Sequence, residues 1–163
     1  MKLLNLQAIG VIKTPFKTTE EMPIQPTGGR GVQGKIEVLE QYAGGLEDLD
    51  GFSHIIIIYH FHQTRKYELK VIPFMDDTFR GIFATRAPKR PNPIGFSVVR
   101  LNRVKNNFLY IEDVDMLDGT PLLDIKPFIP DVDSPEVDKL GWLEGISEKM
   151  KHKKSDNRFN YEE

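Results

Sequence analysis

The chain of 163 residues contains no cysteine, and this absence excludes several kinds of protein at once. A disulfide scaffold, a cysteine-ligated zinc site, an iron–sulfur cluster and a thiol nucleophile all require that residue. The length corresponds to about one domain. With 39% apolar residues, such a domain can build its core without covalent cross-links.

Long hydrophobic runs are also absent. The longest apolar run, Ile55–Tyr59, has five residues, whereas a membrane-spanning helix needs about 20. The first six residues carry one lysine but neither a long apolar region nor an Ala-x-Ala cleavage site, so we expect no signal peptide. The sequence therefore predicts a cytoplasmic protein without a membrane partner.

An excess of positive charge is missing from the chain as a whole but not from its middle. Lys and Arg number 22 against 24 Asp and Glu, which gives a net charge of −2. Between Thr78 and Ile111, however, there are seven basic residues and no acid, and ten acids follow between Glu112 and Glu144. Two interpretations stay open: the basic block presents a surface to phosphate, or the two blocks lie on adjacent strands and pair their charges.

Helical patterns are few, whereas short apolar runs separated by 13 glycines and 11 prolines are many. Helical turns are expected only at 46–49 and 142–150. Many short strands with few helices predict an all-β protein, a small barrel or bent sheet with a few short helices at its ends. The expected strands are 9–12, 35–40, 54–61, 68–73, 81–85, 95–104, 108–113 and 122–126.

The expected domain covers residues 1–147, and residues 148–163 form a basic C-terminal tail. This tail is interpreted as a solvated, fraying terminus, with an RNA-contacting extension as the alternative.

Three familiar signals lead to no function here. The segment 29–34 fits G-x-G-x-x-G, but Pro23 and Pro26 precede it and a strand-like alternation follows, so it indicates a loop rather than a dinucleotide site. His60 and His62 lie about 6.6 Å apart along a strand and His54 about 20 Å from His60. Without a third nearby ligand, no metal site is predicted. Ser97 lacks the surroundings of a hydrolase nucleophile.

Two other segments carry chemistry. In the segment 84–95 three prolines fix an extended path that holds Arg86 and Arg90, and guanidinium groups on such a path suit carboxylate or phosphate. The turn Asp118–Pro121 lies between two apolar runs. It is either a plain hairpin turn or a turn whose backbone amides and Thr120 hydroxyl meet a ligand.

Taken together, these segments resemble the TrmO (TsaA-like) family of tRNA methyltransferases over residues 6–130. The Arg-Pro-Asn-Pro-Ile-Gly string at 90–95 is the most specific element. The other matching pieces are 9–12, 14–16, 25–26, 49–54, 61–63, 81–86, 118–121 and 124–127.

The resemblance implies a small single-sheeted barrel, unlike Rossmann methyltransferases, and S-adenosyl-L-methionine as the methyl donor. It implies a homodimer with cofactor sites near the subunit contact. It also implies methylation of N6 of threonylcarbamoyl-adenosine at position 37, in the anticodon loop of tRNA. Two alternatives are a module that binds S-adenosyl-L-methionine together with RNA or a regulatory partner without turnover, and a methyltransferase with another acceptor.

Carried over residue by residue, the resemblance assigns a cofactor pocket, with Arg86 facing the methionine carboxylate. RNA contacts are expected from Arg80, Lys89, Arg90 and Asn92, and Phe16, Phe79 and Phe83 either stack a base or belong to the core. His62 and Tyr59 are candidate proton acceptors, but they lie on opposite faces of an extended strand, so no catalytic residue is assigned. The expected cofactor-binding residues are Gln25, Pro26, Thr27, Gly28, His62, Gln63, Arg86, Asp118, Gly119, Thr120 and Pro121.

Overall fold

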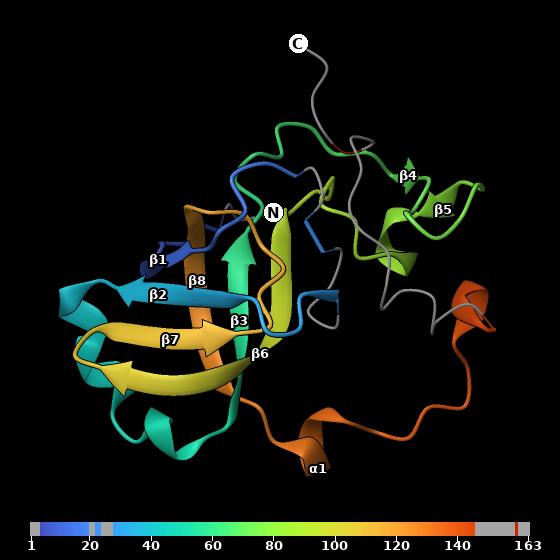
Figure 1. Ribbon diagram of the computed structural model, residues 1–163. Helices are drawn as coiled ribbons and strands as arrows, with labels where there is room; N and C mark the ends of the chain where they lie inside the picture. The colour runs from blue at the N-terminus through green and yellow to red at the C-terminus, as the bar shows by residue number, and fades with distance from the viewer. Residues whose placement is uncertain (1–3, 20–21, 24–27, 146–158, 160–163) are drawn as a thin grey trace.

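A computed structural model describes residues 4–19, 22–23, 28–145 and 159, and its main element is a closed six-stranded antiparallel barrel (Figure 1). The strand order around the ring is β1-β2-β7-β6-β3-β8. This confirms the predicted all-β barrel. The barrel strands are β1 (Gly10–Lys13), β2 (Gln33–Val38), β3 (His54–His60), β6 (Ile94–Lys105), β7 (Phe108–Glu112) and β8 (Thr120–Pro127).

Strict alternation in β3 explains how the barrel is filled. Ile55, Ile57 and Tyr59 are buried, and the residues between them are half-buried. The partner strand β6 places Gly95 opposite Tyr59. A side chain at Gly95 would overlap the Tyr59 ring, so only glycine allows this close approach. The pairing of β3 with β8 shifts register between Ile58 and Tyr59, an irregularity typical of strongly bent strands.

The two ends of the barrel differ. At one end the 3₁₀ helices η2 (Glu40–Leu46) and η3 (Leu49–Gly51) place Leu46 and Leu49 in the main core. At the other end β3 finishes and β6 and β8 begin, and we call this the site end. The remaining short helices are η4 (Ile82–Ala84), α1 (Pro130–Asp133) and η5 (Gly141–Leu143). No helix among the described residues has the length and apolarity to cross a membrane.

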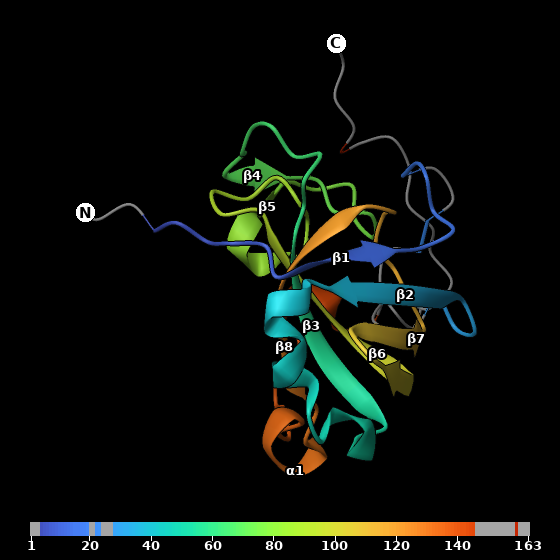
Figure 2. The same cartoon turned by 90° about the vertical axis from the view of Figure 1, so that its left-hand side faces the viewer.

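The segment 61–93, which we call the excursion, leaves the barrel after β3 and returns to it at β6 (Figures 1 and 2). Strands were predicted at 68–73 and 81–85, and the second prediction was wrong for most of its length, because 82–84 form the 3₁₀ helix η4. They shrink to β4 (Lys70–Val71) and β5 (Arg80–Gly81), which pair only with each other. The physical reason is closure, because a ring of six paired strands leaves no free edge for further strands.

The predicted helical turn at 46–49 falls on the junction between η2, which ends at Leu46, and η3, which begins at Leu49. That at 142–150 corresponds to η5, beyond which residues 146–150 lie outside the described residues. The division into a domain of 1–147 and a tail of 148–163 stays a prediction. Within the tail the described residue is Phe159, which packs edge-on against Phe74, with ring centroids 4.9 Å apart.

Candidate functional site

Four segments distant in sequence meet at the site end of the barrel. The Phe61 amide donates to the Pro93 carbonyl (2.8 Å), which joins the two ends of the excursion. The Gly31 amide donates to Asp113 Oδ1 (2.9 Å), which joins the glycine-rich turn to the segment before β8. The Gly119 amide donates to the Ile12 carbonyl (2.9 Å). The Thr120 hydroxyl lies 3.5 Å from His62 Nδ1, which joins the segment 113–121 to the residues that follow β3. The end of β3, the glycine-rich turn, the excursion and the segment 113–121 therefore form one region.

The turn at Asp118–Pro121 is not a plain hairpin turn. The strands on either side of it, β7 and β8, are not neighbours in the barrel, so the hairpin interpretation was wrong. Asp118 accepts hydrogen bonds from the Thr14 amide (3.0 Å) and from Lys17 Nζ (2.7 Å), and the Lys17 bond is the main reason that its pKa is lowered. Gly119 has a φ of +77°, which favours glycine, and a side chain there would meet open space. The Asp118 and Gly119 amides donate to the carbonyls of Phe16 (2.7 Å) and Ile12 (2.9 Å), so the predicted contact of these two amides with a ligand was wrong. The open side of the turn is at the Gly119 Cα.

Thr120 and His62 lie side by side, as the expected pocket requires. Thr120 Oγ1 donates to the Leu117 carbonyl (2.7 Å) and lies 3.5 Å from His62 Nδ1. Burial is the main cause that lowers the pKa of His62 from its ordinary 6.5, with the nearby charge of His60 adding to it. Its surroundings therefore favour the neutral form of His62. Of the other expected cofactor contacts, Gln63 and Gly28 are exposed, and Gln25, Pro26 and Thr27 lie outside the described residues.

Three of the four cations predicted for the site, Arg80, Lys89 and Arg90, bind other groups of the excursion. Arg90 Nη1 donates to the carbonyls of Ile82 (3.1 Å) and Thr85 (2.8 Å), so Arg90 stabilises the loop in which it lies. Lys89 pairs with Glu68 (2.7 Å) and Arg80 with Asp76 (2.6 Å). The expected RNA contacts at these three residues and at the exposed Asn92 stay predictions.

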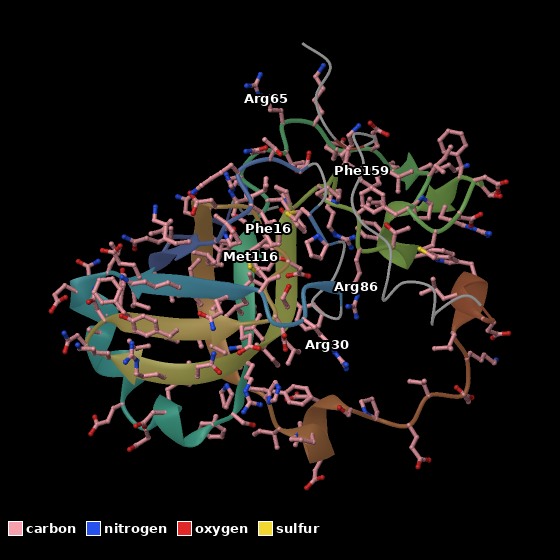
Figure 3. The ribbon with its side chains drawn as sticks, viewed as in Figure 1. Phe16, Arg30, Arg65, Arg86, Met116 and Phe159 are labelled. Atoms are coloured by element: carbon pink, nitrogen blue, oxygen red, sulfur yellow. The ribbon has the colours of Figure 1, made fainter. Side chains whose placement is uncertain are left out.

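Arg86 is different, because it forms no ion pair with any residue that the structure describes. Its guanidinium carbon lies 5.2 Å from the centre of the Phe96 ring. Figure 3 shows Arg86 and Arg30 on the same side of the barrel. Among the cations predicted for the site, Arg86 is therefore the one whose charge is available to a ligand.

Sequence reasoning missed a buried chain of polar side chains that feels the charge of Arg86. Tyr59 Oη lies 3.1 Å from Ser97 Oγ, and Ser97 Oγ donates to Asp115 Oδ1 (2.7 Å). Burial raises the pKa of Asp115 from its ordinary 3.8 to about 7, and the hydrogen bond from Ser97 and the charge of Arg86 oppose that rise. Burial also raises the pKa of Tyr59 far above its ordinary range, so this phenol stays protonated. A carboxyl in the apolar run 114–117 was the available signal.

Fold and site together define a small closed-barrel domain in which an arginine-bearing loop and an Asp-Gly-Thr-Pro turn meet at one end. The family model described as the tRNA-methyltransferase O N-terminal domain matches residues 11–134. The chain belongs to this family.

Two curated proteins and one solved structure illustrate the similarity. The probable S-adenosyl-L-methionine-binding protein of Pyrococcus abyssi is 50% identical over 93% of this chain and 82% of its own length. The tRNA (adenine(37)-N6)-methyltransferase of Escherichia coli is 35% identical over 82% of this chain and 61% of its own. The crystal structure of TrmO from Pseudomonas aeruginosa has a TM-score of 0.73 and 34% identity, and the match covers 86% of this chain and 63% of that one. The chain thus spans about six tenths of the latter two proteins.

Proposed function

We propose that the chain transfers the methyl group of S-adenosyl-L-methionine to N6 of threonylcarbamoyl-adenosine at position 37 of tRNA. Membership of the family supports the reaction class. The observation that carries the proposal is the placement of Arg86. Arg86 is a cation without an ion-pair partner among the described residues. Its charge lowers the pKa of Asp115, which lies three residues before the Asp118–Pro121 turn.

The donor set at the site end fits a ligand that bears an amino acid and a nucleoside. When bound, the cofactor supplies a methyl group already activated by its positive sulfur. Arg86 would hold the carboxylate through paired N–H donors, and the open space beside the Gly119 Cα would leave room for the base. Thr120 and His62 close the same region. These residues orient the ligand, and orientation alone can supply roughly 7–11 kcal/mol of a barrier.

The excursion offers a surface suited to an unpaired RNA loop. Phe83 and Phe79 are 76% and 65% exposed, whereas Phe16 packs against the main core, so two of the three aromatic candidates are available for stacking. Arg90 lies beneath the Phe83 ring, 5.7 Å from its centre. Exposed rings flanked by cations bind single-stranded nucleic acid by stacking and phosphate contact.

Methyl transfer from labelled S-adenosyl-L-methionine to total tRNA, followed by nucleoside mass spectrometry, tests the proposal. Label in N6-methyl-threonylcarbamoyl-adenosine is the expected result. Label in another nucleoside would show that the enzyme methylates a different acceptor from the one proposed. Cofactor binding without labelling would favour a binding module, the activity that the name of the Pyrococcus abyssi relative describes.

The role of Arg86 is tested separately by calorimetry with S-adenosylhomocysteine, which carries the carboxylate but cannot react. We expect Arg86→Ala to weaken binding about tenfold or more, because a charge-assisted bond contributes about 1.5–3 kcal/mol. The affinity of Arg86→Lys for S-adenosylhomocysteine should lie between those of the wild type and Arg86→Ala, since lysine keeps the charge but loses the paired donors. 5′-Methylthioadenosine, which lacks the carboxylate, is the control ligand and should bind all three proteins alike. An equal loss for both ligands would contradict the assignment.

We also infer, from the resemblance alone, that the chain works as a homodimer in the cytoplasm. Light scattering on a sizing column would then give twice the protomer mass of 18.7 kDa. A protomer mass at micromolar concentration would overturn the dimer.

A further inference from the structure

The methyl transfer proposed above requires a group that takes a proton. A C–N bond forms while the C–S bond breaks, the electron pair of the broken bond stays on sulfur, and the acceptor nitrogen loses its hydrogen as a proton. The lone pair of that nitrogen is delocalised into the purine and the carbamoyl group, so the nitrogen is a weak nucleophile without help. A side chain that binds protons in the neutral range suits this task best.

Most titratable groups at the site end are unsuited to it. Tyr59 is already protonated, because burial raises its pKa. Both oxygens of Asp118 already accept hydrogen bonds, from Thr14 and Lys17, and its pKa is lowered, so it is a poor proton acceptor. His62 is half-buried beside Thr120, and its lowered pKa makes it a weaker base than free histidine. His62 is therefore the rival candidate to Asp115.

Asp115 has the surroundings of a group prepared to exchange a proton. It is 9% exposed, and one carboxyl oxygen accepts the Ser97 hydroxyl, which in turn contacts Tyr59. These hydrogen bonds fix the position of the Asp115 carboxyl group, and Ser97 is the one side chain among the described residues that donates to it. Burial disfavours its charged form, and the Ser97 bond and Arg86 favour it, so neither form dominates in the neutral range.

The charged groups around Asp115 are few. Arg86, from the excursion, acts on it from outside the barrel, and Tyr59 faces it from β3 through Ser97 of β6. On its own segment, Asp113 is bonded to the Gly31 amide and Asp118 to Lys17. Arg86 is thus the one charge, within the described part of the chain, that acts on the Asp115 carboxyl.

We propose that Asp115, which is held by Ser97 in the buried chain with Tyr59, accepts the proton that leaves the acceptor nitrogen. The inference rests on the proposed function. The carboxylate becomes a neutral carboxylic acid in the step, and the proton then leaves to solvent past the exposed Arg86. Ser97 and Tyr59 are positioning residues, because they act through the Asp115 carboxyl.

The first test is independent of turnover. Carbon-13 NMR of the aspartate carboxyl groups, with the Asp115 signal assigned by its loss in Asp115→Asn, should show a titration midpoint near 7. Ser97→Ala should move that midpoint upward, since the charged form loses a hydrogen-bond donor. A midpoint below about 5 would overturn the proposal.

The second test follows single-turnover methyl transfer against pH with saturating cofactor and tRNA. In the wild type we expect the rate to rise with pH through the NMR midpoint. Asp115→Asn should lose about 100- to 10,000-fold, the usual contribution of a general base, and should lose the pH dependence. Ser97→Ala keeps the carboxylate, so it should stay active with its pH midpoint displaced upward. S-adenosylhomocysteine binding serves as the folding control for both variants.

The variant His62→Gln distinguishes between His62 and Asp115 as the proton acceptor. A pH dependence lost in His62→Gln and kept in Asp115→Asn would assign the proton to His62 and overturn the proposal. If the wild type labels tRNA and Asp115→Asn does so at the same rate, only the role of Asp115 falls. If the wild type labels no tRNA, the proposed function falls with it.

Discussion

The barrel and the excursion are held together by different physics, although they form one continuous chain. Among the described residues, 15 buried side chains form the main core of the barrel. The excursion has a separate core of Val71, Ile82 and Ala87, against which Phe159 packs. Polar contacts compensate, since Arg90, Lys89 and Arg80 each bind a group of the excursion itself. The barrel thus provides rigid positions, and the excursion carries most of the exposed rings and cations expected to meet RNA.

Truncating a side chain of the barrel core should have the largest effect on the free energy of unfolding, larger than truncating one in the excursion core. Ile57 is completely buried, and its neighbours across the two strand pairs are Ser97 and Ile125. Ile57→Ala should lower the free energy of unfolding by about 4 kcal/mol, because a closed barrel cannot collapse around the cavity. Urea denaturation measures the loss. Val71→Ala in the excursion core is the control, and an equal global loss there would show that the two cores are one.

The ionisation of Asp115 should produce the next largest effect. Its pKa is about 7 in the folded protein and 3.8 ordinarily, so folding favours its protonated form. That stabilisation is complete below pH 3.8 and is lost as the pH rises to 7. From pH 5 to 8 the wild type should therefore lose about 3 kcal/mol relative to Asp115→Asn. Urea unfolding of both proteins at the two pH values measures the difference, and parallel pH curves would contradict it.

Arg90 tests whether polar contacts hold the excursion. Arg90→Met keeps the aliphatic stem but removes two charge-assisted hydrogen bonds to carbonyls, for which we expect a local loss of about 2 kcal/mol. Hydrogen exchange should accelerate at 82–90 while the barrel strands stay protected. Arg100→Met, at an exposed position of β6, is the matched control. Faster exchange throughout the barrel would mean that the excursion is not a separate unit.

The same difference explains what the sequence could predict. The alternation at 54–61 and the turn residues around each apolar run were sufficient for the six barrel strands, because burial on one face leaves a direct pattern. The chain Tyr59–Ser97–Asp115 could not be predicted. It joins residues 38 and 18 positions apart, and the contact depends on strand register and on the path of the segment 113–119. The stabilising role of Arg90 was hidden for a similar reason, since its partners are backbone carbonyls without a sequence signature.

Substituting Phe83 should have the smallest effect of these changes, and it should affect RNA binding by the excursion without affecting cofactor binding. Its ring is exposed and stands over Arg90, so Phe83→Ala should weaken binding of an anticodon stem-loop RNA about tenfold, within the usual contribution of one stacked base. Phe83→Trp should retain binding, and S-adenosylhomocysteine affinity should stay unchanged in both variants. Fluorescence anisotropy at fixed salt measures the RNA affinity. Val132→Ala is the matched control, because Val132 is an equally exposed apolar residue on α1, which lies far from the excursion (Figure 1). An equal loss in both would place the RNA elsewhere than on the excursion, and the barrel would then have to supply the contact.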